Sequence, residues 1–287
     1  MVYDESNFED WGEQHEEERE SIEIDLLLEG LHRYYGYDFR SYVRSSIRRR
    51  IQNRIKLEKL TTITALLEKI LHDRSMGERL IKDFSINVTE MFRDPSFFRA
   101  FRSKIAPQLR ELPEIRIWHA GCSTGEEVLS MAILLEEEGL LNKTSIYATD
   151  MNGDVVNKAR SRAYPLSRMQ GYTKNYLQSG GIREFSSYYT TDHEYAYFAS
   201  RLMQRITFFQ HNLVTDRSFN EFHVIVCRNV LIYFDMSLQN RTMDLFHESL
   251  CASGFLGLGS KESLLYADKV GHYEPVDSLE KLYKKTY

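Results

Sequence analysis

The sequence predicts an α/β protein in two parts, with a small helical domain placed before a doubly wound, mostly parallel sheet. Two observations lead to this prediction. All five prolines lie at or after Pro95, and before them apolar residues recur at helical spacing. From about residue 114 onward, short apolar segments alternate with amphipathic ones, which is the pattern of strands connected by helices.

The first part of the chain divides again by composition. Residues 1–20 hold nine acids and one arginine, and we expect them to form a frayed acidic leader. Residues 21–90 are predicted to form the helical domain, because their apolar residues recur every three or four positions. Gly30, Gly36 and Gly77 are the expected breaks between its helices.

Residues 91–287 are predicted to form the α/β domain. Its expected strands are 115–120, 145–149, 206–210, 222–227 and 255–258, with a final antiparallel pair at 273–276 and 281–287. Its expected helices are 126–138, 155–162 and 238–251. Residues 163–205 interrupt the alternation with tyrosines and two strand-like segments, 183–190 and 194–199, which favours an inserted antiparallel β-unit over a structureless loop.

The composition narrows the class of protein. Hydrophobic residues at 42%, charged residues at 28% and a net charge of −5 are ordinary for a soluble globular protein and do not indicate nucleic acid. We see no signal peptide and no apolar run long enough for membrane insertion, and three cysteines, an odd number, suggest free thiols, so we expect a cytoplasmic protein. Histidines and cysteines never occur at ligand spacing, and no metal site is predicted.

The segment 120–127, Ala-Gly-Cys-Ser-Thr-Gly-Glu-Glu, follows a predicted strand and opens a helix. A glycine such as Gly121 lets the backbone approach a ligand closely. Glu126 and Glu127 stand where a phosphate would bind, and two acids repel a phosphate but attract an ammonium or sulfonium. This favours S-adenosylmethionine over a nucleotide. The alternative is a tight turn whose acids complement the helix dipole.

Asp150 ends the next predicted strand. At this position of nucleoside-binding α/β folds, an acid accepts hydrogen bonds from the ribose hydroxyls. The alternative is a cap for the following helix, a role that Asn152 could also fill.

Two further segments carry polar residues at informative positions. Residues 87–95, Asn-Val-Thr-Glu-Met-Phe-Arg-Asp-Pro, lie at the junction of the two parts, where Thr and Asn could equally cap a helix. Residues 227–235, Cys-Arg-Asn-Val-Leu-Ile-Tyr-Phe-Asp, follow a buried-type strand. An Arg, an Asn and a Tyr are thereby delivered to the crevice beyond the strand ends, where ligands bind in such sheets.

Residues 40–59 hold eight Lys or Arg residues against the single acid Glu58. At 100° per residue the basic side chains do not share one face of a helix. A solvated helix and a helix that binds an acidic partner are both compatible with this pattern.

Taken together, these segments resemble the CheR family of chemotaxis receptor glutamate methyltransferases. The resemblance covers nearly the whole chain from about residue 21. It rests on six segments in the family's order, which are 87–94, 118–127, 148–150, 212–213, 227–235 and 259–263. It departs from the family at Met91, where Phe is usual, at Val128-Leu129 and in the Gly-Ser-Lys-Glu of the last segment.

The resemblance implies a class I, Rossmann-like methyltransferase domain with a small helical N-terminal domain and an inserted antiparallel β-subdomain. It implies S-adenosylmethionine as cofactor, S-adenosylhomocysteine as its product, and no metal. The implied cofactor contacts are Asn87, Thr89, Arg93, Gly121, Glu126, Asp150, Asn212, Leu213, Arg228 and Asn229.

The resemblance also implies an activity, which is methylation of glutamate carboxylates on the acidic cytoplasmic helices of chemoreceptors. Arg93 and Tyr233 would be the catalytic residues beside the transferring methyl. The implied substrate-binding residues are Arg44, Arg48, Arg50 and Arg54. A glutamate is already ionised at neutral pH, so this transfer needs no general base. The alternatives are an enzyme of the same fold acting on another acidic protein or a small carboxylate, and a signalling module that binds the cofactor without turnover.

Overall fold

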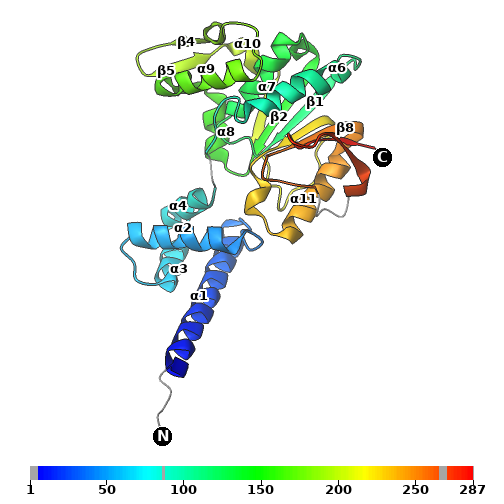
Figure 1. Cartoon of the computed structure of the whole chain (residues 1–287). Coiled ribbons are helices and arrows are strands. Elements are labelled where there is room, and N and C mark those ends of the chain that lie inside the picture. Colours follow the sequence, from blue (N-terminus) through cyan, green and yellow to red (C-terminus); the bar gives the residue numbers. More distant parts are fainter. Residues whose placement is uncertain (1–5, 86–87, 265–269, 287) are drawn as a thin grey trace. The chain divides into compact units, whose positions relative to one another are not determined.

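The computed structural model describes residues 6–85, 88–264 and 270–286 (Figure 1). The chain separates into two compact units. One comprises residues 1–86 together with the short segment 233–235, and the other comprises residues 87–232 and 236–287.

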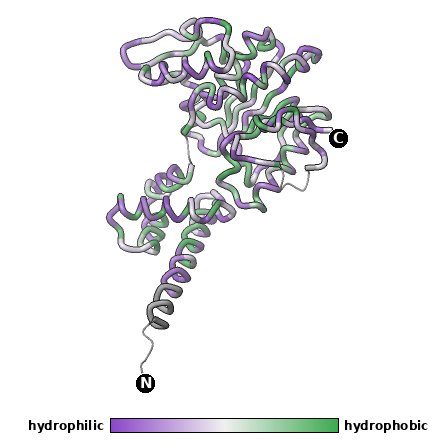
Figure 2. The backbone as a smooth tube through the Cα atoms, viewed as in Figure 1, coloured by the Kyte–Doolittle hydropathy of each residue, from purple (hydrophilic) through white to green (hydrophobic). Residues whose placement is uncertain are grey.

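The first unit is helical. Its helices are α1 (Ser6–Tyr35), α2 (Arg44–Leu57), α3 (Ile63–His72) and α4 (Arg74–Phe84). Hydrophilic and hydrophobic residues alternate along these helices, as Figure 2 shows, and the apolar stripes meet in a core that includes Leu27, Ile47 and Leu66. Because α1 begins at Ser6, the expectation of a frayed leader is wrong from that residue on. Glutamate is a good helix former, and no proline interrupts the acidic stretch.

The three glycines of this unit have different roles. Gly36 has a φ of 80° and directly follows α1, as expected. The expected breaks at Gly30 and Gly77 are wrong, because both lie inside helices. A Cβ at Gly77 would lie 2.1 Å from Cζ of Tyr35, so this glycine provides space for an aromatic ring.

The segment 233–235 belongs to the helical unit through backbone hydrogen bonds. The amide of Val43 donates to the carbonyl of Tyr233 at 2.9 Å, and the amide of Asp235 donates to the carbonyl of Ser41, also at 2.9 Å. The middle residue of the segment, Phe234, forms a β-bridge with Tyr42.

The second unit is built on a seven-stranded sheet in the order β6-β2-β1-β7-β8-β10-β9. The strands are β1 (Ile115–Ala120), β2 (Thr144–Asp150), β6 (Ile206–Gln210), β7 (Phe222–Cys227), β8 (Leu250–Leu258), β9 (Tyr273–Asp277) and β10 (Leu282–Lys285). The first five are parallel to one another, whereas β10 runs antiparallel to both β8 and β9. This confirms the predicted doubly wound sheet with an antiparallel pair at its end. The strand order reverses at β1, and β1 and β7 therefore flank the usual ligand crevice.

Helices connect these strands. They are α5 (Pro95–Ala100), the π-helical turn η1 (Phe101–Ile105), α6 (Ala106–Leu109), α7 (Glu126–Glu137), α8 (Gly153–Arg160) and α11 (Met236–Ser249). Shorter 3₁₀ turns are η2 (Leu141–Lys143), η5 (Leu231–Tyr233) and η6 (Val270–His272). Most side chains of α7 are buried. Trp118 of β1 is fully buried, and its indole N–H donates a hydrogen bond to the hydroxyl of Thr149.

Residues 163–205 form the predicted antiparallel insertion. Its three-stranded sheet has the order β3-β5-β4, with β3 (Ala163–Pro165), β4 (Tyr189–Thr191) and β5 (Tyr195–Phe198). It also contains η3 (Leu166–Arg168), α9 (Met169–Gln178), η4 (Phe185–Tyr188) and α10 (Ser200–Met203). The sequence does not predict α9. The expected strand at 183–190 is half taken up by the turn η4, and only its last two residues lie in β4. None of the helices formed by the described residues is long and apolar enough to cross a membrane.

Candidate functional site

The loop between β1 and α7 folds tightly onto the end of β2. The amides of Gly121 and Cys122 both donate to the carbonyl of Thr149 at 2.8 Å. Gly121 has a φ of 82°, and a Cβ there would lie 2.4 Å from Cγ2 of Val230. A larger residue would therefore be strained and would also displace the loop that follows β7.

Asp150 fixes the same loop from the end of β2. Its carboxylate accepts hydrogen bonds from the amide of Ser123 at 2.9 Å and from the amide of Asn152 at 3.0 Å. The cap of α8 is Asn152, whose side chain accepts from the amide of Asp154 at 3.0 Å. The capping alternative for Asp150 is therefore excluded. Burial raises the pKa of Asp150 above its ordinary value.

Glu126 begins α7 and is only 1% exposed. The hydroxyl of Thr124 donates to its carboxylate at 2.6 Å, whereas Tyr172 and Arg168 lie farther away, at 3.4 and 3.5 Å. Burial raises the pKa of Glu126, because these partners do not fully replace water. Burial also raises the pKa of Tyr172 to about 12, which keeps its hydroxyl protonated as a donor.

Glu127 follows Glu126 in the first turn of α7 and is tightly paired. Its carboxylate lies 3.1 Å from Nδ1 of His119 and accepts a hydrogen bond from Arg228 at 2.9 Å. Burial alone would raise the pKa of Glu127, but the hydrogen bond from His119 and the charge of Arg228 hold it below its ordinary value.

Arg228 is committed to contacts within the protein. Its Nη2 donates to Asp94 at 2.7 Å, its Nη1 donates to the carbonyl of Arg93 at 3.2 Å, and its guanidinium lies 4.1 Å from the ring centroid of Phe97. The side chain is 1% exposed. These contacts occupy the guanidinium, and the assignment of Arg228 to the cofactor stays a prediction. Together with Glu127, Arg228 positions the turn that presents Arg93.

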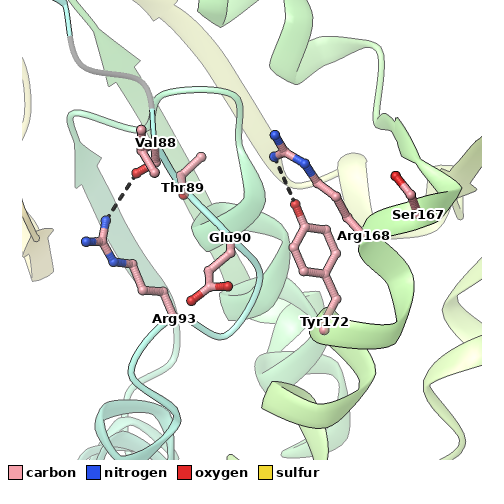
Figure 3. Close-up of a pocket in the computed structure, with 8 residues that line it drawn as sticks. Val88, Thr89, Glu90, Arg93, Ser167, Arg168 and Tyr172 are labelled. Atoms are coloured by element: carbon pink, nitrogen blue, oxygen red, sulfur yellow. Dashed lines mark hydrogen bonds between the residues drawn. The ribbon is translucent and has the colours of Figure 1, made fainter.

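A pocket of about 560 Å³ opens beside these residues, a volume in the range of small-molecule sites. It is lined by Val88, Thr89, Glu90, Arg93, Ser167, Arg168, Gly171 and Tyr172. Figure 3 shows Arg93 and Arg168 on opposite sides of the view with Glu90 between them. Two predicted cofactor residues, Thr89 and Arg93, therefore line one pocket, and the Arg93 guanidinium donates to the Val88 carbonyl at 3.1 Å. A third, Asn87, lies outside the described residues.

Two more predicted positions follow strands of the same sheet edge. Asn212 and Leu213 come after β6, where the amide of His211 donates to the carbonyl of Asp150 at 3.1 Å. The side-chain oxygen of Asn212 accepts from the amide of Val214 at 3.0 Å, which fixes the turn. These contacts place the pair of residues on the Asp150 side of the sheet edge.

Asn229 follows β7 in a left-handed conformation with a φ of 61°. Glu262, a residue to which the sequence interpretation gave no role, supports this turn. Its buried carboxylate accepts hydrogen bonds from the amides of Gly259 at 2.6 Å, Asn229 at 3.0 Å, Val230 at 2.8 Å and Leu231 at 2.7 Å. The only sequence signal for Glu262 is its place in the segment 259–263 that resembles the CheR family.

Comparison with known families agrees with this geometry. Residues 87–278 match the CheR methyltransferase SAM binding domain, and residues 22–85 match the CheR methyltransferase all-alpha domain. The chain belongs to the CheR methyltransferase family. A Pseudomonas putida protein named Cher3 is 46% identical over 94% of this chain and 99% of its own length. A chemotaxis protein methyltransferase of Listeria monocytogenes is 28% identical over 80% of this chain and 86% of its own. One from Borreliella burgdorferi is 28% identical, covering 84% and 88%.

S-adenosylmethionine is therefore the cofactor of this CheR-family protein, and the described residues fit it. A buried carboxylate, Glu126, suits a cationic group, and Asp150 stands at the strand end where α/β folds bind a ribose. Within the described part of the chain, no group of three or more His, Cys, Asp or Glu residues is arranged around a possible metal site.

Tyr233, the second residue assigned to catalysis, belongs to the helical unit. The guanidinium of Arg50 lies 5.9 Å from the centroid of its ring. The pairing of Tyr233 with Arg93 at the transferring methyl stays a prediction.

Arg44 and Arg48, the two more exposed of the four arginines expected to bind substrate, are paired with acids of α1. Arg44 donates to Asp25 at 2.6 Å, and Arg48 donates to Glu20 at 2.9 Å. Both arginines remain substantially exposed, so these pairs are of the weak surface kind.

The two inner arginines of α2 serve the fold of the helical unit. Arg54 donates hydrogen bonds to both carboxylate oxygens of Asp83, at 2.7 and 2.8 Å, and its side chain is only 12% exposed. Arg50 donates to the backbone carbonyl of Asp83. Both arginines therefore tie α2 to α4, and the assignment of Arg50 and Arg54 to the substrate stays a prediction that competes with these contacts.

Proposed function

We propose that this CheR-family protein transfers the methyl group of S-adenosylmethionine to glutamate carboxylates on the acidic cytoplasmic helices of a chemoreceptor, giving glutamate methyl esters. The observation that carries the proposal is the pocket in which Arg93 lies on a turn fixed by Arg228 and Glu127. An arginine held in this way attracts and orients a carboxylate. The names of the Listeria and Borreliella relatives, which are chemotaxis protein methyltransferases, agree with it.

The chemistry needs little from the protein beyond positioning. The cofactor supplies an electrophilic methyl group on a sulfonium. A glutamate carboxylate is ionised at neutral pH, so one of its oxygens can accept the methyl without a general base. An amine acceptor would have to lose a proton first, and the acid that lines the pocket among the described residues, Glu90, is too weak a base for an ammonium.

The individual roles follow the strand ends. We assign Glu126 to the amino group of the cofactor and Asp150 to its ribose. Asn212 and Leu213 are assigned to the adenine side. Thr89, Asn229 and Asn87, which lies outside the described residues, are assigned to the remaining contacts. Gly121 lets the cofactor approach the backbone. Arg93 and Tyr233 would orient the acceptor carboxylate toward the methyl.

We further propose that the acceptor helix docks on a different face of α2 from the one first expected. Arg49 and Lys56 are both exposed. They are seven residues apart and therefore lie on one face of the helix. This face can offer two charges to an acidic helix without breaking the contacts of Arg50 and Arg54.

The activity is tested by incubating the full chain with methyl-labelled S-adenosylmethionine and chemoreceptor cytoplasmic fragments. We expect label that is released as methanol by mild base, and its loss in Arg93→Ala. Base-stable label would indicate N-methylation and would overturn the proposal. Cofactor binding by calorimetry without any transfer would favour a non-catalytic signalling module, whereas transfer only to other acidic proteins or small carboxylates would favour another acceptor.

The docking face is tested by charge reversal. The double variant Arg49→Glu/Lys56→Glu should raise KM for the receptor fragment by about tenfold and leave cofactor affinity unchanged. Arg74→Glu on α4, whose arginine is 85% exposed, is the matched control. An equal rise in KM for the control would mean that only net charge matters, and no rise in either would remove α2 from the interface.

A further inference from the structure

The insertion contributes two side chains to the cofactor pocket. Arg168 ends η3 and Tyr172 lies on the first turns of α9, and both line the cavity together with Thr89 and Arg93 (Figure 3). Neither residue belongs to the segments that resemble the CheR family. Their presence in the wall means that the insertion shapes the site as well as extending the domain.

The two side chains meet the buried carboxylate of Glu126. Nη1 of Arg168 lies 3.5 Å from Oε1 of Glu126 and 3.4 Å from the hydroxyl of Tyr172, which itself lies 3.4 Å from the same Oε1. These distances are long for charged hydrogen bonds. The Arg168 side chain is 52% exposed, and a guanidinium has five N–H donors. It can therefore donate hydrogen bonds to an additional anion bound in the pocket.

The acidic Glu126 beside the basic Arg168 is complementary to a group that carries both an ammonium and a carboxylate. The methionyl end of S-adenosylmethionine carries an ammonium and a carboxylate on the same carbon atom. A site that holds the ammonium at Glu126 therefore brings the carboxylate close to whatever cation lies next to Glu126, and that cation is Arg168. An acceptor glutamate side chain has no ammonium beside its carboxylate, and a phosphate would be repelled by Glu90, which lines the pocket.

We propose that Arg168, steadied by Tyr172, binds the α-carboxylate of the methionyl end of S-adenosylmethionine. The insertion then completes the amino-acid subsite of the cofactor pocket. This inference rests on the assignment of Glu126 to the amino group, and it is independent of which acceptor the enzyme methylates.

The test compares two ligands that differ only in the amino-acid end. S-adenosylhomocysteine carries it, and 5′-methylthioadenosine lacks it. Isothermal titration calorimetry on the full chain should show that Arg168→Ala weakens S-adenosylhomocysteine about tenfold and leaves methylthioadenosine unchanged, since a charge-assisted hydrogen bond at a half-exposed site is worth about 1.4 kcal/mol. Arg168→Lys should recover part of the loss, and Tyr172→Phe should cost about threefold.

The insertion offers a matched control in Arg201, which is 46% exposed and donates to Glu136 at 2.9 Å outside the pocket lining. Arg201→Ala should change neither affinity. If Arg168→Ala lowers the affinity for both ligands equally, Arg168 only supports the structure of the pocket. If it lowers neither affinity, the proposal is overturned. A rise only in KM for the acceptor would transfer Arg168 to acceptor binding. If Glu126→Gln leaves S-adenosylhomocysteine affinity intact, the assumed role of Glu126 fails first.

Discussion

The first turn of α7 separates two charged clusters made of the same residue types. Glu126 lies 3.5 Å from Arg168, which lines the pocket, whereas Glu127 accepts a hydrogen bond from Arg228 at 2.9 Å. The pocket arginine is 52% exposed, whereas the inner one is 1% exposed. Burial raises the pKa of Glu126, but the pKa of Glu127 is held low, because its hydrogen bond to His119 and the charge of Arg228 outweigh its burial.

The difference shows how one helix N-terminus supports both structure and binding. A carboxylate with close partners stabilises the fold and has no capacity left for a ligand. A buried carboxylate whose cationic partner is distant costs stability and can regain it from a cationic ligand. The inner cluster also positions the turn of Arg93, so the rigid side of the helix supports the pocket side.

The largest expected effect is on the inner cluster. Arg228→Ala leaves the half-buried carboxylate of Glu127 without its cation and should lower the free energy of unfolding by about 3–5 kcal/mol. Urea unfolding followed by circular dichroism measures this. Arg168→Ala is the matched control in the outer cluster and should cost about 0.5 kcal/mol or less. Similar losses in the two variants would mean that the clusters do not differ.

The next effect is on affinity and belongs to the outer cluster. Glu126→Gln should weaken S-adenosylhomocysteine about 10- to 100-fold, because a charged hydrogen bond contributes about 1.5–3 kcal/mol. Stability should not fall. The folded-state pKa of Glu126 is raised, so its stabilising contribution is present below the ordinary value of 4.5 and is lost as the pH rises through the folded pKa. A calorimetric affinity equal to that of the native protein would contradict the assignment.

Glu127 has the opposite pH dependence. Its folded-state pKa is lowered, so its contribution is present above the ordinary value of 4.5 and is lost as the pH falls through the folded pKa. Glu127→Gln should therefore cost about 1–3 kcal/mol at pH 7, and this difference from the native chain should shrink below about pH 4.5. Urea midpoints at pH 7 and pH 4 measure it. A difference that stays constant with pH would show that the charge of Glu127 is not what matters.

The sequence predicts the part of the site that lies at the ends of the parallel strands. Glu126 and Asp150 follow neighbouring parallel strands, and such ends meet at one sheet edge whatever the connecting loops do. Thr89 and Arg93 were found through the family resemblance. Arg168 and Tyr172 carry no comparable signal, because they approach Glu126 from 42 and 46 residues away through α9, a helix that the tyrosine-rich composition of the insertion did not indicate.

The internal contacts of Arg50 and Arg54 could not be predicted from the sequence for a related reason. Charge density along the sequence shows that Arg50 and Arg54 need partners or solvent, but it does not say which. The partner is Asp83, 29 residues beyond Arg54, and only the packing of α4 against α2 brings it close. Counting acids nearby in sequence therefore could not distinguish a binding face from an internal ion pair.

The same comparison of a buried with an exposed ion pair can be made in the helical unit, where the expected effects are smallest. Arg54→Ala breaks a paired contact with Asp83 and should lower the free energy of unfolding by about 1–2 kcal/mol, while Arg44→Ala breaks an exposed pair with Asp25 and should cost about 0.5 kcal/mol or less. If Arg54 has only this structural role, KM for the receptor fragment should stay unchanged in enzyme that remains folded. A raised KM without loss of stability would return Arg54 to the acceptor surface, and the docking face would then include both sides of α2.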